Sequence, residues 1–228
     1  MSDPTTEGAC VSEHAFVHKL WEDCWPNLGG LLGANGVFLL WCVPTAVAAL
    51  LQLWWLAIAV CPVTVGPAMV GLFAYAANLA AERPASWWRD SVRGFRAGFG
   101  GGVLWAAVMI TAWAASRLAL THALDAAMSV GAVALWSVQM ALSLVLSVTG
   151  AYAFSLVALY RQGTKAAIRN ATLLTLAHPM AGLGLVGAGI LTSLLSQLLC
   201  WGPLIILPSI CAVLAVNTTL LLVQRHHA

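Results

Sequence analysis

The sequence has few charged residues, and this shortage sets it apart from soluble proteins. Asp, Glu, Lys and Arg make up 8% of its 228 residues, whereas apolar residues make up 61% and the mean hydropathy is +0.89. A soluble domain carries about 25% charged and about 45–50% apolar residues. The formal net charge of +2 is too small to suggest nucleic acid as a partner. We therefore expect an integral membrane protein.

Motifs of enzymatic chemistry and of zinc binding are also missing. The six cysteines form no CxxC pair and no metal-finger spacing, as is typical of free thiols that behave as small apolar groups. A disulfide between Cys61 and Cys200, at two predicted outer span ends, has no local support. No Ser-His-Asp order, Walker loop or zincin helix occurs. The sequence predicts neither an enzyme nor a cofactor.

Apolar stretches long enough to cross a bilayer recur along the chain. A transmembrane helix needs about 20 apolar residues to cross a ~30 Å hydrocarbon core. Residues 28–228 therefore predict an all-α transmembrane bundle of six spans. The expected spans are Gly36 to Val60, Ala68 to Ala81, Gly101 to Leu120, Ala126 to Tyr160, Ala171 to Leu199 and Pro203 to Val223. A tight outer turn from Cys61 to Pro67 is expected between the first two.

Two amphipathic segments are predicted to lie on the membrane surface. Residues 1–27 form a cytoplasmic N-terminal segment in which Val11 to Trp25 favours a short amphipathic helix. The only charge-dense stretch runs from Glu82 to Arg96, with Ser86 as its expected N-cap. Its apolar residues recur at helical spacing, at Trp88, Val92, Phe95 and Phe99. Aromatic residues at headgroup level are typical of an interfacial helix.

Positive charge falls on one side of the predicted bundle. Of the ten Lys and Arg residues, only Arg117 lies on the other side. The rest are Lys19, Arg83, Arg89, Arg93, Arg96, Arg161, Lys165, Arg169 and Arg225. Cytoplasmic loops carry an excess of Lys and Arg. We therefore expect a multi-pass protein of the cell (inner) membrane with both termini in the cytoplasm.

Several segments, taken in order, resemble the YesL-like family of bacterial integral membrane proteins, which carry a domain of unknown function. They are Asn35 with Trp41 and Pro44, Pro62 to Ala68, Trp87 to Arg96, Arg169 to Leu174, and Leu207 to Ser209 with Asn217. Thr45 to Val60 departs from the family, whose members pass almost directly into the Pro62 to Ala68 turn. Members often occur beside sugar-uptake ABC transporter components. The resemblance implies an accessory or scaffold subunit linked to carbohydrate ABC transport, with membrane lipids and other membrane subunits as partners.

Two sets of basic residues are the first candidate site. Arg89, Arg93 and Arg96 lie on the predicted interfacial helix, and Arg161, Lys165 and Arg169 follow the fourth span. If the third and fourth spans pack together, the two sets form one inner surface. That surface either binds anionic lipid, or docks a protein with an acidic face, or only sets the orientation of the chain.

Polar residues within the spans are the second candidate site. Gln139, Ser143, Ser147 and Gly150 share one face of the fourth span, and Asn217 lies in the sixth. This face is either a groove for a small neutral solute, as in a passive carrier or channel, or a packing surface for another helix. Arg117 lies near the outer end of the third predicted span, and no Asp, Glu, Lys or Arg lies in the interior of any span, which argues against an ion-coupled pump. A lipid-sensing regulatory protein is the third alternative.

A stripe on the N-terminal helix is the third candidate. Cys10, His14, His18 and Glu22 stand four residues apart, so their side chains share one face. His pairs at this spacing can hold a divalent metal. A polar stripe that faces water has the same spacing, and we favour it because no second ligand segment is identifiable. No metal is therefore predicted.

Overall fold

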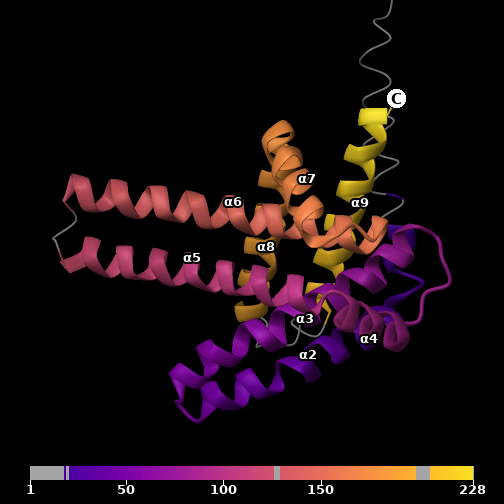
Figure 1. Ribbon diagram of the computed structural model, residues 1–228, viewed down its shortest axis with the longest axis horizontal. Helices are drawn as coiled ribbons and strands as arrows, with labels where there is room; N and C mark the ends of the chain where they lie inside the picture. Colours follow the sequence, from indigo (N-terminus) through magenta and orange to yellow (C-terminus); the bar gives the residue numbers. More distant parts are fainter. Residues whose placement is uncertain (1–17, 19–20, 126–128, 199–205, 228) are drawn as a thin grey trace, which may run out of the picture.

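The computed structural model describes residue 18 and residues 21–125, 129–198 and 206–227. In these residues the regular secondary structure is helical and no strand occurs, so the all-α prediction is confirmed for them. The principal helices, labelled in Figure 1, are α2 (Leu28–Leu50), α3 (Trp54–Ala80), α4 (Trp87–Ala97), α5 (Phe99–Asp125), α6 (Val130–Tyr160), α7 (Thr164–Ala177), α8 (Pro179–Leu198) and α9 (Leu207–His227).

Four of these helices, α2, α3, α5 and α6, are long and apolar enough to cross a membrane. The pair α7 and α8 also qualifies, but with a bend of 100° between the two helices. The apolar part of α9, Leu207–Val223, is shorter. The described residues therefore give four candidate crossings, or five with the bent pair. A multi-pass membrane protein is supported, whereas the predicted count of six is not.

The first predicted span and the turn after it are wrong. The chain turns at residues 51–53, where Gln52 adopts a left-handed conformation with φ of 59°. The Leu53 N–H donates to the Ala48 carbonyl and the Gln52 N–H to the Ala49 carbonyl, both at 2.9 Å. These two bonds close a Schellman motif. The expected turn from Cys61 to Pro67 instead lies inside α3, which begins at Trp54.

A single helix from Ala171 to Leu199 is also wrong, because the chain bends at His178. Pro179 is the first residue of α8, where a proline loses nothing by lacking an N–H. The ring of a proline also disfavours helical geometry in the preceding residue. His178 accordingly leaves the helical region, with φ of −130° and ψ of 64°. The predicted fifth span is therefore divided between α7 and α8.

Helix α3 is the centre of the fold and packs against α2, α4, α5, α6 and α9. A side chain on Gly66 would collide with the Gly102 carbonyl of α5. A Cβ atom on Gly71 would lie 2.6 Å from the Ser91 carbonyl oxygen of α4. Small residues at such crossings let helix backbones approach closely, which is how helices associate in lipid. The glycines of α3 therefore set the positions of α4 and α5.

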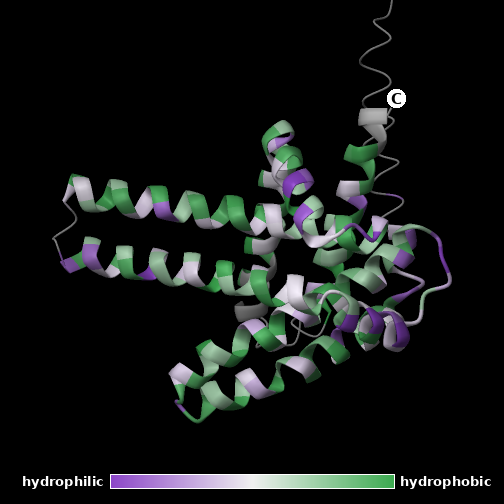
Figure 2. Cartoon of the chain, in the orientation of Figure 1, coloured by the Kyte–Doolittle hydropathy of each residue, from purple (hydrophilic) through white to green (hydrophobic). Residues whose placement is uncertain are grey.

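The α5–α6 pair runs side by side and projects beyond the other helices (Figure 1). At 1.5 Å per residue, the 31 residues of α6 extend about 46 Å, more than a ~30 Å core requires. The excess length predicted for the Ala126 to Tyr160 segment is thus present in one continuous helix. Hydrophobic residues cover this hairpin and α2–α3, and hydrophilic residues gather around α4 and the loop before it (Figure 2).

The two ends of the described chain meet. The Asn217 side-chain amide on α9 donates to Asp23 Oδ2 at 3.1 Å, and both side chains are buried. The Ser209 hydroxyl donates to the Leu31 carbonyl at 3.0 Å. Helix α9 therefore lies beside the start of α2 and the segment before it.

Substitution of Gly66 tests the crossing of α3 and α5. We expect Gly66→Ala to lower the thermal unfolding temperature in detergent, because the added methyl group must push the α5 backbone away, at a cost of about 1–3 kcal/mol. Gly36 on α2 is the matched control, since an added Cβ atom there has no neighbour within 4 Å. Gly36→Ala is expected to be neutral or slightly stabilising. Equal unfolding temperatures for the two variants would contradict the crossing.

Candidate functional site

Helix α4 is fixed on the surface of α2 and α3. Ser86 is its N-cap, as predicted, but the bond runs from the Ser86 backbone N–H to Asp90 Oδ2 at 2.7 Å. This single bond is half of a capping box: it satisfies the Ser86 backbone donor, while the Ser86 side chain makes no capping bond. The Phe95 ring stacks on the Trp41 ring of α2, with centroids 4.1 Å apart. Trp88 stays half exposed, as expected for an interfacial helix.

A cavity of about 420 Å³ lies between α3, α4 and the end of α6. Its polar lining consists of Asn78, Arg83, Asp90, Arg93, Arg161 and Gln162. The rest of the lining is small and apolar, namely Val70, Ala74, Gly94, Ala97, Gly98, Val157 and Ala158. Volumes of about 300–1,000 Å³ are usual for small-molecule sites. The size and the mixed lining suit an amphipathic ligand.

Two of the three cavity arginines stand at helix ends. Arg83 follows α3, and its N–H donates to the Asn78 carbonyl at 2.9 Å while Glu82 takes a left-handed φ of 54°. Arg161 is the C-cap of α6, with φ of 52° and its N–H on the Val157 carbonyl. Cations complement the partial negative charge of a helix C-terminus. Both positions are therefore fixed by the backbone.

The cavity carries an excess of positive charge. Its lining holds three arginines and one aspartate, so two formal positive charges remain. Among the described residues, no ion pair joins any of these arginines to a carboxylate. Asp90 is buried, and one of its oxygens accepts the Ser86 N–H. The arrangement can bind an anion.

The predicted inner basic surface forms only in part. The structure brings Arg93 and Arg161 to one cavity, in keeping with the predicted packing of the third and fourth spans as α5 and α6. Arg89 and Arg96 line a separate open groove with Arg93. Lys165 and Arg169 are exposed on α7. Arg83 was not expected in this site, because no local pattern links it to Arg161.

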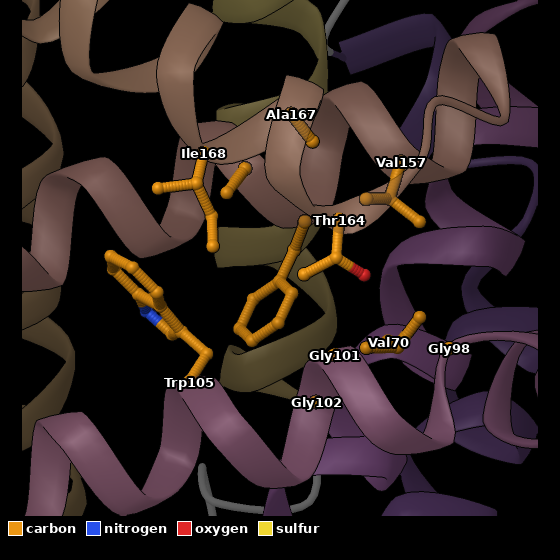
Figure 3. A pocket seen from close by; sticks show the side chains of 11 residues that line it. Val70, Gly98, Gly101, Gly102, Trp105, Val157, Thr164, Ala167 and Ile168 are labelled. Atoms are coloured by element: carbon orange, nitrogen blue, oxygen red, sulfur yellow. The ribbon is translucent and has the colours of Figure 1, made fainter.

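A second, narrow cavity of about 20 Å³ adjoins the first (Figure 3). Val70, Gly98 and Val157 line both cavities. Figure 3 shows Trp105 and Ile168 at one side of it and Thr164 at the other. This volume is close to that of one water molecule, so the second cavity admits no larger group.

The polar face of α6 faces α5. Gln139 Nε2 donates to the Ala112 carbonyl at 3.3 Å, and the Ser143 hydroxyl reaches the same oxygen at 3.2 Å. The Ser147 hydroxyl donates to the Ser143 carbonyl of its own helix at 2.8 Å. A side chain on Gly150 would collide with the Trp105 indole. Of the two readings of this face, the packing surface is the one these contacts support.

Asn217 does not belong to that face. It lies on α9 and bonds Asp23, a residue that sequence reasoning assigned to the solvent-facing N-terminal helix. The structure thus brings a carboxylate into contact with an apolar helix. An acidic residue followed by the Trp25-Pro26 turn gives no sign of that contact, and sequence alone does not identify it.

The predicted metal face is described only in part. Cys10 and His14 lie outside the described residues, while His18 Nδ1 stands 3.3 Å from Glu22 Oε1 with both side chains exposed. The described residues contain no group of three metal-binding side chains. Burial, and then the charge of Asp23, raises the pKa of Cys24 to about 11. This thiol therefore stays protonated at neutral pH and is a poor ligand.

No family model, curated protein or solved structure matches this chain. The likeness to the YesL-like family consequently stays a prediction from the sequence.

The contact between α5 and α6 is tested by enlarging Ser143, which is fully buried. We expect Ser143→Leu to lower the unfolding temperature in detergent, because the larger side chain does not fit between the helices. Such overpacking lowers the free energy of unfolding by about 1–3 kcal/mol. Ser137→Leu is the control, since Ser137 is exposed and bonds only its own helix at Val133. If both variants unfold at the same temperature, Ser143 does not join the helices.

Proposed function

We propose that this protein is an accessory or scaffold subunit of a larger membrane assembly and moves no solute itself. The α5–α6 hairpin carries the proposal. Two polar side chains of its predicted solute face, Gln139 and Ser143, are committed to its own packing, since both donate to the Ala112 carbonyl. A carrier needs such groups free to bind its solute.

The outer surface of the hairpin supports contact with another membrane subunit. Only 17% of an 18-residue apolar stretch of α5 is buried inside the protein, the lowest share among the four candidate spans. Large apolar side chains cover this surface, among them Leu104, Leu118, Leu135 and Val138. Neighbouring apolar helices pack well on such a face in lipid.

The assembly we propose is a carbohydrate ABC transporter, on the basis of the resemblance to the YesL-like family. The subunit would hold the complex through helix packing in the bilayer and through its basic cytoplasmic segments. No step of this role requires catalysis, so we propose no enzymatic activity.

We place the protein in the cell (inner) membrane with both termini in the cytoplasm. The positive-inside rule supports this orientation, because Arg83, Arg93 and Arg161 follow the second and fourth candidate crossings. The Asn217–Asp23 bond supports it independently, since it holds α9 beside the N-terminal segment.

Purification at native expression level tests the scaffold role. A photo-crosslinking residue at Leu118 on α5 is expected to capture another membrane subunit, a sugar permease in the assembly that we propose. The matched control is Leu56 at the tip of α2–α3, which is exposed to a similar degree, 51% against 61% for Leu118. Recovery of the uncrosslinked chain alone would contradict the proposal. Flux of labelled sugar into liposomes that hold only this chain would also contradict it and would favour a carrier.

Cysteine labelling tests the orientation. In a variant without the six native cysteines, Gln52→Cys at the tip of the first hairpin should react with a membrane-impermeant maleimide in intact cells. Gly163→Cys, between α6 and α7, should react only after the cells are permeabilised. Labelling of Gly163→Cys from outside would reverse the orientation.

A further inference from the structure

We propose that the cavity between α3, α4 and α6 binds the phosphate group of an anionic phospholipid, with Arg83, Arg93 and Arg161 as its ligands. Arg93 and Arg161 also belong to the basic cytoplasmic segments of the proposed scaffold. Lipid binding at this cavity goes beyond that role and is tested on the purified chain, without a partner subunit.

The charges of the lining indicate an anion. Guanidinium groups match the geometry of phosphate and bind two of its oxygens at once. The three arginines come from three separate segments and meet at one cavity, where Asp90 is the only carboxylate. Asn78 and Gln162 add neutral side chains whose amides donate hydrogen bonds. A ligand with net negative charge balances the excess of two positive charges.

The depth of the cavity indicates a lipid headgroup. Arg83 stands just past the end of α3, and Arg161 just past the end of α6, where two candidate membrane spans stop. Helix α4 lies at the same level, with Trp87 and Trp88 exposed. Trp residues gather at the interface between hydrocarbon and headgroups. Lipid phosphates occupy this depth.

The lining also distinguishes a lipid from a soluble phosphate compound. Val70, Val157 and Ala158 lie beside the polar residues, so one ligand contacts apolar and charged groups together. A glycerophosphate with the first carbons of its acyl chains has that character, and a hydrated inorganic anion has not. The adjoining 20 Å³ cavity is too small for an acyl chain. The chains therefore stay in the surrounding bilayer.

The site is preformed by its backbone. Left-handed residues at Glu82 and Arg161 end the two spans sharply and fix where the arginine backbones lie. Gly94 lets α4 sit against α3, since a Cβ atom there would lie 2.6 Å from Ala74 Cβ. The backbone needs little rearrangement, so binding orders only the three arginine side chains, which are exposed.

Lipid binding to the purified protein in an uncharged detergent tests the proposal. Native mass spectrometry would measure the affinity for phosphatidylglycerol and for phosphatidylcholine. We expect phosphatidylglycerol to bind more tightly, and Arg93→Gln and Arg161→Gln each to weaken it by about tenfold, as for a lost hydrogen bond between charged groups. Arg169→Gln is the matched control, because Arg169 lies on the same predicted side and outside the cavity. An equal loss in Arg169→Gln would overturn the site.

Asp90→Asn gives a result that misfolding cannot imitate. Asparagine keeps an oxygen for the Ser86 N–H and removes the one opposing charge. We therefore expect phosphatidylglycerol to bind a few times more tightly to this variant. Unchanged or weaker binding, in a variant with the wild-type unfolding temperature, would overturn the proposal.

A competition arm separates the two sources of phosphate. Glycerol 3-phosphate and inorganic phosphate are added to the protein with bound phosphatidylglycerol. We expect neither compound to displace the lipid at concentrations up to about 100 times that of the lipid. The lipid would then bind at least about two orders of magnitude more tightly than either compound. Displacement at equal concentration would assign the site to a soluble phosphate compound and overturn the lipid assignment.

Discussion

Close approach of backbones along α3 is the constraint on which the rest of the structure depends. Lipid tails are as apolar as the side chains, so burial alone does not hold helices together in a bilayer. Gly66 brings α5 onto α3, and Gly71 with Gly94 brings α4 onto it. Helix α5 in turn carries α6. The cavity between α3, α4 and α6 exists because these crossings set the distances between the three helices.

The helical class and most of the membrane-crossing segments were predictable, because a bilayer leaves an apolar chain no other way to satisfy its backbone. The turns were not. Gly66, Pro62 and Pro67 indicate a turn in a protein surrounded by water, whereas in a membrane helix prolines and glycines are common. The true end of α2 has Gln52 in the left-handed conformation. Helix ends of this kind usually carry glycine, so Gln52 gave no local signal.

The basic residues of α4 were predictable from the sequence as part of a candidate site, but the position of that site in the fold was not. Helical spacing puts Arg89, Arg93 and Arg96 on one flank of α4, but it does not say which neighbour that flank meets. Only Arg93 reaches the cavity, where Arg161 joins it from the end of α6. Asn217 shows the same limit, since its partner Asp23 is 194 residues away along the chain. Contacts of that range follow from tertiary packing, which a periodic pattern does not contain.

The bond between Asp23 and Asn217 bears on how the molecule is made. Asn217 is synthesised 194 residues after Asp23. Synthesis proceeds at about 5–20 residues per second, so the carboxylate waits on the order of 10–40 seconds for the amide that binds it. The α2–α3 and α5–α6 hairpins are synthesised by then, and α9 packs against α3 and α6 after them. A nascent chain released before Asn217 therefore lacks the hydrogen bond that joins the segment before α2 to α9.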